Sequence, residues 1–343
     1  MKKKNLFRAL LFIGTVISLF YVPWPILKAW LPPLPSSVQE QVDDAVDMGF
    51  DGIVVYIEVA GEAPDVYTAG LHSRQDSIPA KPEALFKLAS ISKLYRALAF
   101  TKMASRGLLS MDDKLTDFFP ELSGRIEFAD EITVKMLIQH RSGIPNYTDT
   151  EGYWLHPKSS SEENLALVLD LPAQFPPDSD YEYCNTNYLL LGEIMDKVLG
   201  HPHSKFIQSE ILAPLQLNHT YFSLEEVDME DVMSGYHVGY KEDLKYNRTG
   251  MMATAEDVGK FIRALNNGKA FQDDEERSLY SSLYPKEHTG LVPGFQSIAK
   301  YIPEIDAVVV QFTSTTNFHG YNWNLSEISW NRIVDIIEDH HDN

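Results

Sequence analysis

The sequence contains very little cysteine and comparatively few basic residues. Its single cysteine, Cys184, cannot form an intrachain disulfide, so cysteine usage says little about the redox compartment. The 29 Lys and Arg residues are outnumbered by 49 Asp and Glu residues, which gives a formal net charge of -20. A surface of that sign repels a phosphate backbone, which argues against nucleic acid as a partner. No internal repeat is visible, and the only low-complexity stretch is the proline-rich run at residues 31–37.

In size and composition the chain is an ordinary globular protein. Hydrophobic residues make up 44% of the 343 residues and charged residues 23%. A chain of this length can bury a large core, and the length allows either one large domain or two modest ones.

The N-terminus combines a basic start with a long apolar run. Residues 2–4 are lysines and Arg8 follows, before an apolar segment over residues 9–27 that only Pro23 and Pro25 interrupt. That length is about what a helix needs to cross a bilayer. The basic flank would hold the N-terminus in the cytoplasm and the rest of the chain outside it. A cleaved signal peptide has the same pattern, but no clear small-x-small cleavage site follows, so an uncleaved anchor is favoured.

These features divide the chain into three parts. Residues 1–30 are predicted to form a membrane anchor or signal segment, and residues 31–37 a stiff proline-rich spacer. Residues 38–343 are predicted to form one catalytic domain. That domain is expected to lie in the periplasm or outside the cell, and to be secreted if the N-terminal segment is cleaved.

Strand patterns occur at both ends of the domain, with helical patterns between them. Residues 52–60 and 66–70 have the β-branched composition of a hairpin, and residues 296–302 and 307–313 form a second strand pair. The simplest packing joins both pairs in one antiparallel sheet flanked by helices, an α/β (α+β) fold with an inserted all-helical lobe at about residues 107–250. Further helices are predicted at residues 38–48, 133–138, 164–171, 188–199, 255–267 and 324–340.

The stretch Phe86–Leu94 contains a Ser-x-x-Lys motif at the start of a helical pattern. One helical turn brings Lys93 beneath the hydroxyl of Ser90, since residues three apart share a face. The positive end of a helix favours a serine alkoxide and disfavours a protonated lysine, and a serine beside a free-base lysine is what nucleophilic catalysis requires. The motif is short, and Ser90 is equally suited to be a helix N-cap.

Two later stretches decide between these interpretations. One is Tyr183-Cys184-Asn185, which leads into an apolar helical pattern, and the other is His288-Thr289-Gly290 at the entry to the last strand pair. With these motifs in this order, the chain resembles the serine β-lactamase and penicillin-binding protein family. The resemblance is to the branch of class C β-lactamases, D-alanyl peptidases and esterases, and covers about residue 37 to the last strands. Intervening segments support it at residues 111–115, 132–145 and 250–257.

The resemblance implies the β-lactamase/transpeptidase-like fold and a role for each catalytic residue. Ser90 would attack a carbonyl and form an acyl-enzyme, and Lys93 would accept or relay its proton. Tyr183 matches the family's tyrosine, which acts as a general base in its phenolate form or as a proton shuttle. A phenol of ordinary pKa near 10 needs adjacent cations to ionise at neutral pH.

The same resemblance implies the substrate-binding residues. Asn185 would bind the amide side chain of the substrate and hold the lysine. His288 stands where the family commonly has lysine, and it would meet a substrate carboxylate only if its pKa were raised. Gly290, after Thr289, would let a strand edge approach the substrate, and the backbone N–H of Leu291 would complete an oxyanion hole with that of Ser90.

We therefore predict an extracytoplasmic serine hydrolase that acts on a D-Ala-type peptide or ester through an acyl-Ser90 intermediate. The histidine at position 288 favours a peptidase or esterase over the alternative, a class C-like β-lactamase. An alternative of another class is a non-catalytic penicillin-binding or sensor protein. Substrates implied by the family are peptidoglycan stems, lactams and esters.

No metal site and no cofactor are predicted. Two pairs of histidines, His201 with His203 and His340 with His341, are interpreted as surface residues. No class A deacylation glutamate and no Ser-Asp-Asn motif are visible, so the deacylating water would be activated by the Tyr183 and Lys93 pair. The pocket walls are expected to come from the loops around four aromatic residues, Tyr147, Tyr153, Trp154 and Tyr221.

Overall fold

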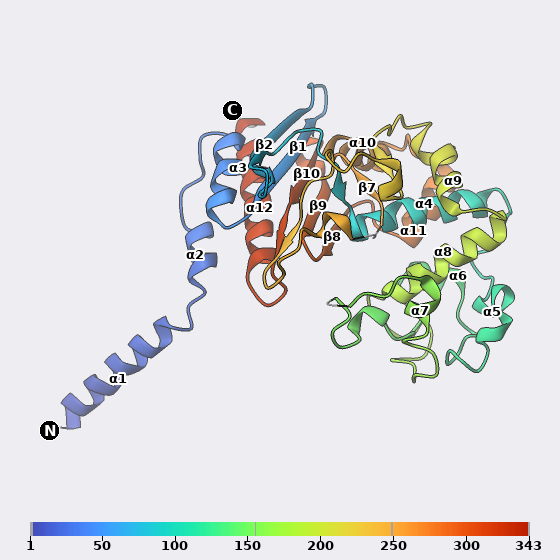
Figure 1. The fold of residues 1–343 in the computed structure, drawn as a ribbon, viewed down its shortest axis with the longest axis horizontal. Helices are drawn as coiled ribbons and strands as arrows, with labels where there is room; N and C mark the ends of the chain where they lie inside the picture. Colours follow the sequence, from blue (N-terminus) through green and yellow to red (C-terminus); the bar gives the residue numbers. More distant parts are fainter. Residues whose placement is uncertain (1–2, 155, 248–249, 342–343) are drawn as a thin grey trace.

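The computed structural model describes residues 3–154, 156–247 and 250–341 and is organised around one antiparallel sheet. The sheet has six strands in the order β3-β2-β1-β10-β9-β8, so strands from the two ends of the chain lie side by side (Figure 1). The predicted α/β fold with a shared antiparallel sheet is confirmed. The strands are β1 (Gly52–Val59), β2 (Asp65–Ser73), β3 (Ile78–Pro79), β8 (His288–Val292), β9 (Phe295–Ile302) and β10 (Ala307–Thr313).

The two central strands are buried on both faces. Ile53 and Val55 of β1 belong to the core on one side of the sheet, while Val54 and Tyr56 belong to the core on the other. This division follows from the alternation of side chains along a strand. Continuous runs of β-branched residues therefore suit β1 and its partner β10, which is buried along its whole length.

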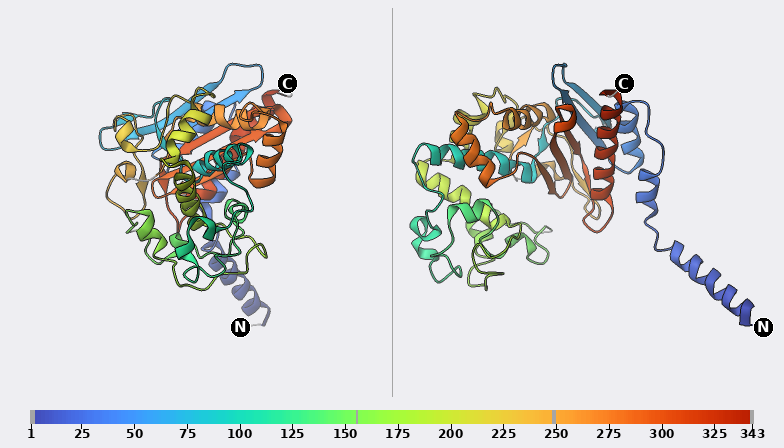
Figure 2. Two further views of the ribbon diagram at one scale, coloured as in Figure 1. Left: turned by 90° about the vertical axis from the view of Figure 1, so that its right-hand side faces the viewer. Right: turned by 180° about the vertical axis from the view of Figure 1, so that it is seen from behind.

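Two helices cover the first face of the sheet. They are α3 (Val38–Asp47) and the closing helix α12 (Asn322–His341), which pack against each other beside the strands (Figures 1 and 2). Arg332 of α12 is buried, and its guanidinium donates to Gln41 Oε1 at 2.6 Å. It also donates to the carbonyls of Pro32 and Pro33 at 2.9 and 2.8 Å. The proline-rich spacer is thus held against the domain at these two residues, although the predicted boundaries stay predictions.

The second face packs against α10 (Ala255–Asn267) and the helical lobe. Gly259 of α10 lies so close to the sheet that a Cβ there would be 2.1 Å from the Tyr56 ring. Behind it runs α4 (Ser92–Ser105), whose Lys102 forms a buried ion pair of 2.8 Å with Glu276 of α11 (Asp274–Leu283). The first contact fixes α10 relative to the sheet, and the ion pair fixes α4 relative to α11.

The lobe at about residues 107–250 is mainly helical, but the prediction that it is all-helical is wrong. Its β5 (Thr220–Tyr221) joins β7 (Met252–Ala253) and β4 (Phe86–Lys87) in a small sheet, and β6 (Tyr236–His237) pairs with β11 (Thr315–Thr316). Two-residue strands are too short to show a period of two in the sequence. The other helices of the lobe are α5 (Leu115–Phe118), α6 (Val134–Ile138), α7 (Ser161–Leu165), α8 (Asn185–Leu199) and α9 (His203–Ile207).

The helix predicted at residues 164–171 is displaced. A capping box at Ser160 starts α7 earlier, at Ser161, and the helix ends at Leu165. Asp170 adopts a φ of 64°, which no helix allows, and its carboxylate accepts two hydrogen bonds from Arg125. Local capping therefore overrides the apolar spacing of the segment.

The apolar N-terminal run forms two helices instead of one. α1 (Lys3–Leu19) extends away from the body, whereas α2 (Trp24–Trp30) packs against α12 (Figure 1). No single helix among the described residues is long and apolar enough to cross a membrane; α1 and α2 together pass that test but meet at a bend of 73°. The continuous segment expected over residues 9–27 is broken near Pro23, whose ring cannot continue a helix.

Candidate active site

Ser90 lies in a single 3₁₀ turn, Ala89–Ile91, that runs directly into α4. Ala89 has a φ of 48°, in the left-handed region, which costs about 1–2 kcal/mol for a residue with a Cβ. The N-cap of α4 is Ile91, and no side chain caps this helix. The interpretation of Ser90 as a capping serine is therefore wrong, and strained backbone at this turn is typical of a functional site.

The Ser90 hydroxyl is held by two side chains. Lys93 Nζ, one turn further along, donates to Ser90 Oγ at 3.1 Å. The Tyr183 hydroxyl donates to the same oxygen at 2.6 Å, from a residue 93 positions away in the sequence. Lys93 Nζ also donates to Asn185 Oδ1 at 2.9 Å. The structure thus brings together the four residues that the Ser-x-x-Lys and Tyr-x-Asn motifs predicted.

Burial shifts Lys93 and Tyr183 towards their uncharged forms. Lys93 is 6% exposed, and burial, with a smaller effect from the charge of Arg96, lowers its pKa to about 7. At neutral pH a large share of the amine is therefore free base. Burial raises the pKa of Tyr183 above its usual value, partly offset by the hydrogen bond to Ser90. A neutral Tyr183 fits the proton-shuttle role better than the phenolate.

Asn185 is oriented by a network that sequence reasoning did not identify. Its Nδ2 donates to Thr148 Oγ1 at 3.0 Å, and its backbone N–H donates to Asn146 Oδ1 at 3.0 Å. Asn185 is also the first residue of α8, which begins three residues before the predicted start at Tyr188. The segment at residues 132–145 that supports the resemblance ends just before Asn146 and Thr148, so it did not reveal this network.

The edge strand β8 lies directly against the Ser90 turn, where the sheet meets the helical lobe (Figure 1). A Cβ on Gly290 would come within 2.4 Å of Leu88 O, 2.3 Å of Ser297 Oγ and 3.2 Å of Ala89 Cβ. Only glycine therefore permits this approach of strand to turn. Thr289 and Leu291 line the cavity on either side of Gly290, and the oxyanion hole at the Leu291 and Ser90 amides stays a prediction.

Replacing Gly290 by alanine is expected to push β8 away from the Ser90 turn. We expect a loss of about 1–3 kcal/mol in the free energy of unfolding, the usual cost of overpacking, together with a loss of activity. Urea unfolding and ester hydrolysis measure both. The control is Gly192→Ala in α8, where the Cβ would meet only His203 Cε1 at 3.5 Å. Unchanged stability and activity in Gly290→Ala would contradict the close contact.

His288 does not supply the cation that was expected of it. Burial lowers its pKa to about 4, so the imidazole is neutral at neutral pH. Nδ1 lies against the carbonyl of Thr289, which can only accept, so the ring proton is on Nδ1. Nε2 then accepts from the Tyr284 hydroxyl at 2.9 Å. Both ring nitrogens are thus occupied. The condition set for His288, a raised pKa, is not met, because burial lowers the pKa instead.

A cavity of about 760 Å³ opens above Ser90. Tyr147, Tyr153 and Trp154 line it as predicted, and Trp323 of α12 adds a further aromatic wall. The expectation for Tyr221 is wrong, since its side chain packs instead on the small apolar cluster of Leu85, Val232 and Met252. Among the described lining residues there is no carboxylate, in contrast to the acidic composition of the whole chain.

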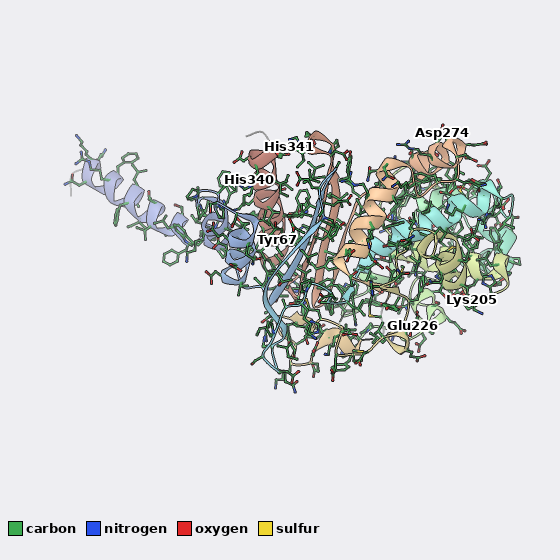
Figure 3. All side chains as sticks on the ribbon, turned by 90° about the horizontal axis from the view of Figure 1, so that it is seen from above. Tyr67, Lys205, Glu226, Asp274, His340 and His341 are labelled. Carbon is green, nitrogen blue, oxygen red and sulfur yellow. The ribbon has the colours of Figure 1, made fainter. Side chains whose placement is uncertain are left out.

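The paired histidines do not form metal sites in the described part of the chain, where no group of three His, Cys, Asp or Glu residues lies close enough to hold an ion. His203 pairs instead with Asp196 at 2.7 Å. His340 and His341 lie together at the exposed end of α12 (Figure 3), on the side of the sheet away from the helical lobe. The absence of a cofactor stays a prediction.

The comparisons with known proteins agree with this geometry. A family model described as Beta-lactamase matches residues 38–287, well over half of the chain. The chain belongs to the beta-lactamase family. The match ends one residue before His288. The position where this chain has histidine and the family commonly has lysine therefore lies just outside the matched region.

Relatives within the beta-lactamase family are distant. Penicillin-binding protein 4* of Bacillus subtilis is 28% identical over 199 residues, which cover 57% of this chain and 43% of that protein. Protein flp of Staphylococcus aureus is 26% identical over 211 residues, 60% of this chain and 42% of the other. The chain thus matches less than half the length of these relatives.

Solved structures share the fold. The D-amino acid amidase of Ochrobactrum anthropi, in complex with L-phenylalanine amide, superposes with a TM-score of 0.78 at 21% identity, covering 88% of this chain and 98% of the amidase. A penicillin-binding protein of Bacillus halodurans gives a TM-score of 0.72 at 19% identity, with the same coverage. At these identities the likeness establishes the β-lactamase/transpeptidase-like fold alone.

Proposed function

We propose that this protein is a serine hydrolase that cleaves an amide or ester through an acyl-Ser90 intermediate. The observation that carries the proposal is the Ser90 Oγ held between Lys93 Nζ and the Tyr183 hydroxyl. As Oγ bonds to the substrate carbonyl carbon, its proton passes to the neutral amine of Lys93. The C–N or C–O bond then breaks, and the leaving group takes a proton through Tyr183.

Deacylation reuses the same groups in the opposite direction. Water attacks the ester carbonyl of acyl-Ser90, and Tyr183 with Lys93 takes the water proton. The proton returns to Ser90 Oγ as the acid product leaves. No carboxylate among the described residues lines the cavity, so Tyr183 and Lys93 are the groups that transfer the proton.

The cavity favours substrates whose leaving group is uncharged. β-Lactams and D-Ala-D-Ala peptides carry a carboxylate on the leaving side, and a carboxylate that loses its water on binding needs a cation or hydrogen-bond donors in return. His288 is neutral with both nitrogens occupied, and the half-buried Arg96 donates to the carbonyl of Tyr188 at 3.1 Å. Lys158 also lines the cavity, but it is exposed on the helical lobe. We therefore place simple amides and esters ahead of the class C-like β-lactamase alternative, consistent with a D-amino acid amidase among the structural neighbours.

A kcat/KM panel on nitrocefin, p-nitrophenyl acetate, D-phenylalanine amide and a D-Ala-D-Ala peptide tests this selectivity. We expect the ester and the amide to turn over and the two carboxylate substrates to react slowly. His288→Lys should raise the ratio of nitrocefin to p-nitrophenyl acetate kcat/KM by about 10-fold or more, the usual gain from one charge-assisted hydrogen bond. Fast nitrocefin turnover by the wild type would favour the β-lactamase instead.

The proposal also places the catalytic domain outside the cytoplasm, attached through the N-terminal segment. Its support is the apolar surface of α1, where Phe7, Phe12 and Ile17 are 64%, 71% and 51% exposed. Such side chains would be covered in a bilayer. Protease should digest the domain on cells whose outer membrane, where there is one, has been made permeable; protection until the inner membrane is lysed would place the domain in the cytoplasm.

A further inference from the structure

His140 follows α6 in a backbone conformation that its side chain does not favour. Its φ is 59°, in the left-handed region at the helix end, where glycine is the usual residue. The side chain is 2% exposed, inside the molecule between α6 and the start of α8. A histidine there replaces the residue that the backbone would most easily accept.

Two hydrogen bonds from backbone amides connect His140 to the residues on either side of Tyr183. The amide of Glu182 donates to His140 O at 3.1 Å, and the amide of Cys184 donates to His140 Nδ1 at 3.0 Å. The imidazole also packs on the Tyr183 ring, with centroids 4.5 Å apart and planes tilted by 32°. One residue therefore fixes the backbone before Tyr183, the backbone after it and one face of its ring.

These contacts come with two costs to stability. The left-handed φ is one. The other follows from the tautomer: Nδ1 accepts from the Cys184 amide, so the neutral ring has its proton on Nε2. That Nε2 is buried and has no hydrogen-bond partner among the described residues. Strained or unsatisfied groups that persist in a folded protein tend to mark functional sites.

We infer that His140 is a positioning residue, which clamps the chain around Tyr183 and so holds the tyrosine hydroxyl 2.6 Å from Ser90 Oγ. The inference rests on the proposed function, because it assigns His140 a part in the acylation of Ser90. Besides Ser90, no other side chain among the described residues is hydrogen-bonded to the Tyr183 hydroxyl. The direction of the phenol therefore depends on its backbone and on the ring contact.

Two variants of the full chain separate positioning from packing. Asparagine tolerates the left-handed region, and its Oδ1 can occupy the place of Nδ1 and accept from the Cys184 amide. Leucine also branches at Cγ, but its side chain cannot accept a hydrogen bond from the Cys184 amide. We expect His140→Leu to lower the acylation rate constant for p-nitrophenyl acetate about 100-fold with an unchanged substrate binding constant, and His140→Asn to restore most of it. His140→Gly, which removes the acceptor without the φ cost, replaces the leucine variant if that variant does not fold.

A double-mutant cycle completes the test. If His140 acts through the tyrosine, His140→Leu should cause no further loss in a Tyr183→Phe background. A leucine variant that is as fast as the wild type, or an equal loss in both backgrounds, would overturn the positioning role. A wild type that forms no acyl-enzyme at all would overturn the proposed function, and the inference with it.

Discussion

Replacing Ser90 by alanine is expected to abolish hydrolysis and covalent labelling. We expect kcat/KM for p-nitrophenyl acetate to fall about 10⁴-fold or more, the scale found when a covalent nucleophile is removed. The physical reason is that Lys93 and Tyr183 both direct their polar atoms at Ser90 Oγ, and neither group is placed to attack a carbonyl in its stead. Initial rates measured on folded protein check the result.

The matched control for this change is Ser105→Ala, at the other end of α4. Its hydroxyl donates only to the carbonyl of Thr101 at 3.0 Å, and we expect full activity. The same pair of variants separates the enzyme from the non-catalytic sensor. If the wild type reacts with a fluorophosphonate no faster than Ser90→Ala, the result would favour the non-catalytic binding protein over the enzyme.

Removing the amine of Lys93 should have the second largest effect. We expect Lys93→Met to lower kcat/KM about 10³-fold, within the range for a general base. Because the pKa of Lys93 is about 7, the wild-type kcat/KM should also fall tenfold for each pH unit below that value, as the amine takes up a proton and can no longer accept one from Ser90. A pH–rate profile from about pH 5 to 9 measures this acid limb.

Lys93→Arg distinguishes proton transfer from charge. Arginine keeps a positive charge at all relevant pH values and cannot act as a base. We expect it to lose as much activity as the methionine variant and to lack the acid limb near pH 7. Activity close to that of the wild type in Lys93→Arg would mean that the site needs only a cation beside Ser90.

The sequence predicted the large elements well because their signals are local. The strand at residues 307–313 and the helix at residues 255–267 match the structure to the residue. The first contains the β-branched run 308–310, and the second has a Thr254 cap and a left-handed Gly268 at its end. By contrast α11, which lies in an acidic segment, was not predicted. Its Glu276 is stabilised by a buried lysine from α4, which is distant in the sequence although adjacent in the structure.

The candidate site shows the same division. The Ser-x-x-Lys and Tyr-x-Asn motifs were sufficient to place Ser90, Lys93, Tyr183 and Asn185 together. The charge of His288 was not predictable, since it depends on how much water reaches the imidazole and on a partner, Tyr284, whose contact only the folded chain reveals. For the same reason the sequence assigned no role to His140, although it lies in the segment at residues 132–145 that supports the resemblance. Its importance lies in hydrogen bonds to residues more than forty positions away.

The most direct measurement is the mass of the protein after reaction with a fluorophosphonate, followed by peptide mapping. The Ser90 oxygen should replace fluoride at phosphorus, giving one adduct per chain, located on the peptide that contains Ser90. Ser90→Ala should remain at its unmodified mass. An unmodified wild type, or an adduct on any other residue, would contradict the acyl-Ser90 account.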